Sequence, residues 1–235
     1  MIIDAPRKPK LSQQLVNASL WSFVVYVTGA GLTGLAQLVI ARQVGAPSYG
    51  IYAYVMAWTT LLYYGATLGF NMVLLRFVPA YSSTGRWSLA RGVIGYAFQR
   101  SFIVSLAITS SGIALVLTFA NPVQHELAVS LVMGLITVPL FALCVLSSAT
   151  VRTLGGVISA IAPERLVRDG LLLVLVLLAG VFTVVDATTV LLSLVISSVV
   201  TVTLLGFSLR RLWPTKLRSA KSSYEIGRAS CRERV

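Results

Sequence analysis

The sequence predicts an all-α integral membrane protein with six transmembrane helices. Hydrophobic residues make up 57% of its 235 residues and charged residues only 11%, whereas a soluble domain carries about 25% charged residues. The apolar residues gather into six runs separated by short polar connections. A helix rises about 1.5 Å per residue, so about 20 residues cross a hydrocarbon core of roughly 30 Å. No stretch alternates in the manner of a strand, and no segment has the composition of a soluble domain.

The apolar runs divide the chain into four parts. Residues 1–14 form a polar and basic N-terminal segment, residues 15–212 hold the six helices, residues 213–224 form a second basic segment, and residues 225–235 are a tail. The helices are expected at about 15–40, 49–77, 95–120, 126–151, 163–185 and 187–209.

The fifth helix needs a separate argument, because residues 170–185 alone are too short to cross the membrane. Pro163 suits the first position of a helix, and Glu164 suits its first turn. We therefore expect this helix to begin at Pro163. Glu164 would then face Arg168, and Arg165 would face Asp169, each four residues apart on one helix face.

The basic residues predict the orientation in the membrane. Fifteen Lys and Arg residues lie in the N-terminal segment and after the second, fourth and sixth helices, against Arg42 alone on the other side. Positive residues concentrate on the cytoplasmic side, so both termini are expected in the cytoplasm. Because these residues cluster between apolar runs and not on one amphipathic face, the net charge of +12 does not indicate a nucleic-acid partner.

The tail at residues 225–235 reads like the translation of a common sequencing adapter. We expect it to be a scar, with the natural reading frame cut near Tyr224. Without the tail, Cys144 is the single cysteine, so no disulfide is expected. His125 is the single histidine and lies beside Glu126, which is too small a set for a metal site. No cofactor or metal is predicted.

Polar side chains within the second run are the first candidates for a binding cavity. Arg76 falls on the face of Gly65, Gly69 and Met72 at helical spacing, and Asn71 lies nearby. The functional interpretation of Arg76 is that it lines the mouth of a cavity and attracts a pyrophosphate group. The alternative for Arg76 is interfacial snorkelling, in which the charged end reaches water beside the lipid.

The first helix supplies two further candidates. Gln37 belongs to a stripe of small and polar residues, and its alternative role is a hydrogen bond between helices. Arg42 lies near the end of this helix, as Arg76 and Arg100 do in theirs, so no Lys or Arg is expected at the bilayer centre. The substrate-binding candidates are Arg76, Asn71, Gln37 and Arg42.

Two groups of residues resemble the signature of the oligosaccharide (polysaccharide) flippases of the multidrug/oligosaccharidyl-lipid/polysaccharide exporter superfamily. The resemblance spans about residues 11–212. The matching residues are Ala41-Arg42, Gly45, Tyr49-Gly50, Leu68-Gly69, Arg76, Arg152-x-Leu154-Gly155, Pro163-Glu164 and Arg168. The resemblance implies an exporter fold of 12–14 helices in two lobes around a central cavity. This chain would supply the N-terminal lobe.

The resemblance also implies a function. Such a flippase moves a polyprenyl-pyrophosphate-linked oligosaccharide across the inner membrane for surface polysaccharide (O-antigen or exopolysaccharide) biosynthesis. It is not an enzyme, and its partners are the lipid-linked oligosaccharide, the bilayer and the C-terminal lobe. Because one lobe offers one wall of the cavity, we expect this chain alone to be inactive in transport.

Four alternatives remain open from the sequence. A cation-coupled multidrug exporter would carry membrane-buried acidic residues, and the apolar runs show none deep. A lipid II flippase would carry arginines in the first helix, where Ala30 and Ala36 stand here. A membrane-embedded glycan polymerase would need a large outer loop, and a non-transporting membrane scaffold would need no cavity.

Overall fold

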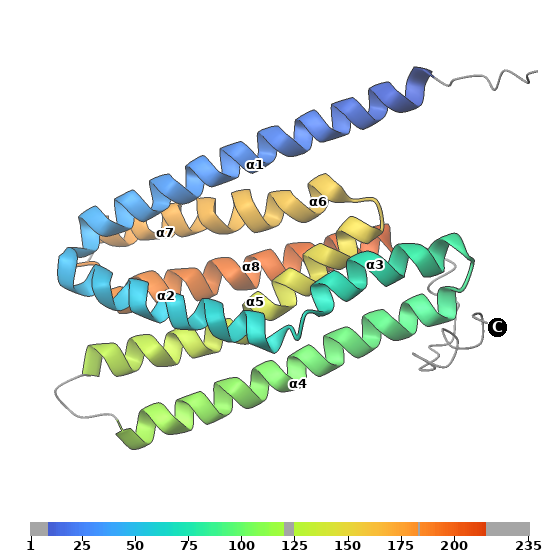
Figure 1. The fold of residues 1–235 in the computed structure, drawn as a ribbon. Coiled ribbons are helices and arrows are strands. Elements are labelled where there is room, and N and C mark those ends of the chain that lie inside the picture. Colours follow the sequence, from blue (N-terminus) through green and yellow to red (C-terminus); the bar gives the residue numbers. More distant parts are fainter. Residues whose placement is uncertain (1–8, 120–124, 183, 215–235) are drawn as a thin grey trace, which may run out of the picture.

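Long helices are the expected outcome of such a sequence, because a chain in lipid must satisfy its backbone hydrogen bonds internally. The computed structural model describes residues 9–119, 125–182 and 184–214, and it is all-helical with no strand in these ranges (Figure 1). The elements are α1 (Pro9–Val44), α2 (Ala46–Ala66), α3 (Phe70–Ser83), α4 (Trp87–Phe119), α5 (His125–Thr153), α6 (Val157–Ala162), the π-helix η2 (Pro163–Val167), α7 (Arg168–Phe182) and α8 (Ala187–Leu212). Most of the predicted segment 1–14 and of segment 213–224, and all of the tail 225–235, lie outside the described residues.

Four helices of the described chain are long and apolar enough to cross a membrane, namely α1, α4, α5 and α8. A fifth span results if α2 and α3, which are bent by 40° at a short break, count as one. The fifth expected helix, together with the residues just before it, is divided into α6, η2 and α7, and α7 alone has 15 residues. These three elements follow one another without a gap.

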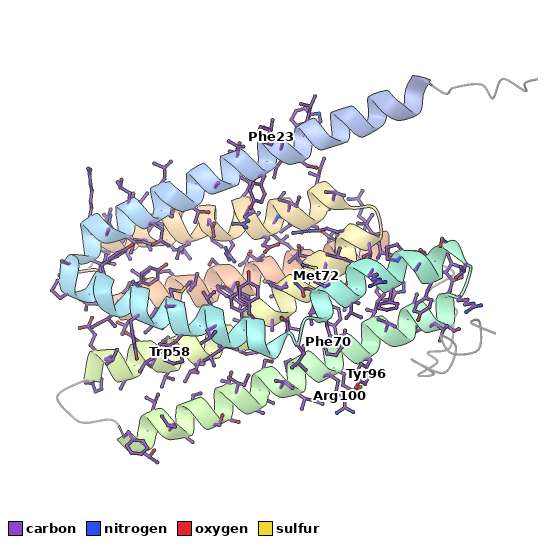
Figure 2. All side chains as sticks on the ribbon, in the orientation of Figure 1. Phe23, Trp58, Phe70, Met72, Tyr96 and Arg100 are labelled. Atoms are coloured by element: carbon purple, nitrogen blue, oxygen red, sulfur yellow. The ribbon has the colours of Figure 1, made fainter. Side chains whose placement is uncertain are left out.

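Large apolar side chains cover the outside of the bundle. Phe23, Trp58 and Met72 are exposed by 66%, 46% and 67% and project from the ribbon (Figure 2). Soluble monomers rarely expose broad apolar surfaces. This outer surface, together with the long apolar helices, is that of an all-α membrane protein.

The helix α5 lies at the centre and packs against α2, α3, α4 and α8. Small hydroxyl residues line its contact with α8, which lets two backbones approach closely. On α8 the hydroxyls of Ser197, Ser198 and Thr201 donate to carbonyl oxygens of their own helix at 2.6–2.9 Å. Polar side chains are therefore buried between these helices without needing a partner across the interface.

The second apolar run, expected as one helix over residues 49–77, breaks between α2 and α3. Leu68 has φ 49° and Gly69 has φ 70°, so both lie in the left-handed region. The Thr67 hydroxyl donates to the Tyr64 carbonyl at 2.8 Å and stabilises the end of α2. The break therefore separates Tyr64, near the end of α2, from Asn71, near the start of α3.

Leu68→Gly is expected to raise the free energy of unfolding by about 1 kcal/mol, because glycine adopts a positive φ without the steric cost that leucine has there. The measurement is SDS-induced unfolding of the purified chain in micelles. Leu61→Gly is the control, since Leu61 is exposed in the regular part of α2, and it should lower stability. Equal losses from both changes would contradict the left-handed conformation at Leu68.

The helix expected to begin at Pro163 begins at Val157, and Pro163 lies inside a continuous helical segment. Proline has no backbone N–H to donate to the preceding turn. A π-helical turn follows, in which the Arg168 N–H bonds to the Pro163 carbonyl. A π-turn changes the angle around the helix axis between side chains that are four residues apart, so such residues no longer share one face. The expected pairs of Glu164 with Arg168 and of Arg165 with Asp169 were therefore wrong.

Candidate functional site

A cavity of about 430 Å³ opens between the α2–α3 segment, α5 and the α6–η2–α7 segment. Its lining is more charged and hydroxylated than the rest of the bundle. The lining residues are Tyr63, Tyr64, Asn71, Leu75, Val145, Ser148, Ala149, Arg152, Glu164, Arg165 and Arg168. Three arginines and one glutamate in this set give the cavity an excess of positive charge.

Arg168 is the most firmly held of the three arginines. Its Nε donates to Asp169 Oδ1 at 2.9 Å, and its guanidinium lies over the Phe141 ring at 5.2 Å. Asp169 also accepts a hydrogen bond from the Thr33 hydroxyl of α1. The exposed fractions are 20% for the Arg168 side chain and 5% for Asp169. This ion pair therefore joins α7 to α1 and α5.

The Arg168–Asp169 pair lies away from the end of the bundle where α1 and α7 end. From Thr33 the helix α1 continues to Val44, and from Arg168 the helix α7 continues to Phe182. At about 1.5 Å per residue, the pair lies about 17 Å from the end of α1 and about 21 Å from the end of α7. The pair therefore lies within the length of the bundle and not at the end where α1 and α7 end. Ionisable residues within membrane-spanning segments usually face a cavity and mark a functional site.

Glu164 and Arg152 form a second charged contact between η2 and α5. Arg152 Nη2 lies 3.4 Å from Glu164 Oε2, and the Ser148 hydroxyl donates to the same oxygen at 2.9 Å. Arg152 Nη2 also donates to the Ser148 hydroxyl at 3.2 Å. The Arg152 side chain is 39% exposed, so it remains accessible from the cavity.

Arg165 is positioned differently, because no carboxylate holds it among the described residues. Its guanidinium lies over the Tyr26 ring of α1 at 5.2 Å. A Cβ placed on Gly29 would approach the Arg165 Cβ to 2.7 Å. Glycine at this position therefore allows α1 to pack against the stem of Arg165.

Aromatic and amide groups make up the part of the lining that comes from α2 and α3. The rings of Tyr63 and Tyr64 have centroids 4.4 Å apart, and Tyr63 meets Phe141 edge-on at 5.3 Å. Tyr64 is 57% exposed. Asn71, which is half-buried at the start of α3, makes no side-chain hydrogen bond to any described residue.

Of the four residues predicted from the sequence, Asn71 alone lines this cavity. Arg76 is exposed and lies over Phe77 at 5.9 Å. Gln37 donates to the Tyr52 hydroxyl at 3.2 Å, which is the hydrogen bond between helices that formed its alternative role. Arg42 is exposed at the end of α1. The binding roles of these four residues stay predictions.

The sequence did not single out the arginines of the cavity as binding residues, although Arg152 and Arg168 belong to the residues that carry the resemblance. Arg152, Arg165 and Arg168 entered the orientation count and were expected beside the membrane interface. Arg100, which was expected near a helix end, lies on the outer side of α4 over the Tyr96 ring at 5.3 Å (Figure 2). What separates it from Arg168 is the direction of the side chain, which a residue pattern does not specify.

The chemistry available in the cavity is recognition of an anion. Guanidinium groups bind phosphate with paired N–H donors and stay charged at any physiological pH. Within the described ranges no group of three His, Cys, Asp or Glu residues is arranged to hold a metal ion.

Comparison with models of protein families, with curated proteins and with solved structures found no match for this chain.

Proposed function

We propose that this chain is the N-terminal lobe of a flippase for polyprenyl-pyrophosphate-linked oligosaccharides. The observation that carries the proposal is the cavity with three guanidinium groups, because it offers a membrane protein a binding site for an anionic head group. The volume of this cavity is about 430 Å³. Small-molecule sites usually have volumes from about 300 Å³ to about 1000 Å³, so the cavity is large enough for such a ligand. The sequence resemblance points to the same class of ligand.

The proposed topology has six membrane crossings. The protein lies in the inner membrane of the cell, and both of its termini lie in the cytoplasm. In its support, the start of α1 and the end of α8 lie at the same end of the bundle (Figure 1), which requires an even number of crossings. The α6–η2–α7 segment would be the fifth crossing. Arg152 then lies on the cytoplasmic side, where the lipid-linked glycan is made.

In the proposed mechanism the arginines bind the pyrophosphate and a second lobe closes the cavity. Rocking of the two lobes would open the cavity to one side of the membrane at a time, as secondary transporters do. The basic residues at the cytoplasmic ends gather the anionic ligand beforehand. No covalent bond of the ligand changes, so the protein acts as a transporter and not as an enzyme.

One observation favours a cation-coupled exporter as a second candidate. Asp169 is a buried acid, and such exporters use buried acids to bind the coupling cation. However, Arg168 and the Thr33 hydroxyl already occupy both oxygens of this carboxylate. Since a paired carboxylate is a weak cation ligand, we prefer the flippase.

Binding of farnesyl diphosphate to the purified chain in lipid nanodiscs tests the proposed function. Arg165→Gln should weaken binding about 10- to 100-fold, because a hydrogen bond to a charged group contributes about 1.5–3 kcal/mol. The measurement is isothermal titration calorimetry.

The matched control is Arg211→Gln, which removes the same charge from an exposed position at the end of α8. Its affinity should stay within about twofold, since exposed charges are screened by salt. Absence of binding by the unmodified chain, or equal losses from both variants, would refute the cavity as the diphosphate site.

A further inference from the structure

The cavity contains polar groups that a diphosphate does not use. Asn71 carries an amide with two N–H donors and a carbonyl acceptor, and it is unpaired within the described chain. Asn71 is half-buried and lines the cavity, so its amide is within reach of a ligand there. An amide carbonyl does not bind a phosphate, so Asn71 fits a ligand that has both donors and acceptors.

Glu164 is a second group that a diphosphate alone would repel. Its contacts with Ser148 and Arg152 both fall on Oε2. Neither contact uses Oε1, which is an acceptor for hydroxyl donors. A carboxylate and an amide that line one cavity match the neighbouring hydroxyl groups of a sugar.

Tyr63 and Tyr64 add an aromatic surface to the same cavity. The exposed ring of Tyr64 rests against Tyr63, which Phe141 supports edge-on. This support fixes the position of the rings. A pyranose has one face of C–H groups, which packs against an aromatic ring while its hydroxyls reach polar side chains.

We propose that Tyr63, Tyr64, Asn71 and Glu164 form a subsite for the first sugar of the lipid-linked glycan, next to the arginines that bind its diphosphate. This inference rests on the proposed function. The cavity, at about 430 Å³, takes a diphosphate with one sugar, and further sugars of the chain lie outside it. The contacts involve the ring face and hydroxyls that every pyranose shares.

The test compares two probes that differ only in the sugar. Farnesyl diphosphate and farnesyl diphosphoryl glucose are titrated into the purified chain in nanodiscs by calorimetry. The sugar-bearing probe should bind about tenfold tighter, which corresponds to one or two additional hydrogen bonds. Asn71→Leu and Tyr64→Leu should each remove most of this gain while the affinity for farnesyl diphosphate stays within about twofold.

Met72→Leu is the matched control, because Met72 is exposed on α3 and does not line the cavity, and it should keep the gain. If the unmodified chain binds neither probe, the proposed function fails. If it binds both equally, or if both cavity variants keep the gain, the sugar subsite is wrong and the diphosphate site remains. Two substitutions on separate helices ensure that a folding defect in one leaves the other informative.

Discussion

Arg168→Met is expected to lower the free energy of unfolding by about 3–5 kcal/mol, the largest loss from any single substitution in the cavity. The change removes the cation and leaves the Asp169 carboxyl group without its charged partner in a buried position, where its side chain is 5% exposed. It also removes the stacking on Phe141. SDS-induced unfolding of the purified chain in micelles, followed by circular dichroism, gives the measurement.

The double variant Arg168→Met/Asp169→Leu separates the cost of an unpaired charge from the loss of an attraction. Replacing both members of a buried ion pair with apolar residues is often close to neutral. The double variant should therefore be more stable than Arg168→Met alone, yet still bind farnesyl diphosphate weakly. A double variant less stable than the single one would show that the pair is not buried against its neighbours as described.

Gly134→Ala is expected to lower the free energy of unfolding by about 1–3 kcal/mol, although alanine is the better helix former. A Cβ at Gly134 of α5 would lie 2.3 Å from Val55 Cγ1 and 2.9 Å from Thr59 Oγ1 of α2. Both contacts are too short and involve side chains that are buried between the helices, so we expect α2 to shift away from α5. This movement would displace Tyr63, which belongs to α2 and lines the cavity.

Gly95→Ala in α4 is the control, because a Cβ there meets nothing within 4 Å. Because alanine has a higher helix propensity than glycine, this change should raise the free energy of unfolding by up to about 1 kcal/mol. The same unfolding assay measures both variants, and farnesyl diphosphate binding reports whether the cavity has changed. Equal stability of Gly134→Ala and Gly95→Ala would contradict the close packing of α2 on α5.

The length of the apolar runs was enough to predict four of the six expected helices. α1, α4, α5 and α8 contain the runs expected at 15–40, 95–120, 126–151 and 187–209. These runs are readable because lipid requires an uninterrupted apolar stretch with its own backbone hydrogen bonds. The breaks in the helices could not be predicted from the sequence. The left-handed φ at Leu68 and the π-turn after Pro163 are local backbone states that depend on neighbouring helices.

The candidate site was only partly predictable for a related reason. Asn71 was identified because a polar residue stands out within an apolar run. Arg165 and Arg168 did not stand out, since the sequence placed them at a helix start near water. Packing of the α6–η2–α7 segment against α1 and α5 makes them line a cavity, and the side that a long side chain takes is decided by these neighbours. The sequence by itself determined a helical membrane protein with basic connections, and the tertiary structure decided which of its charges meet in a cavity.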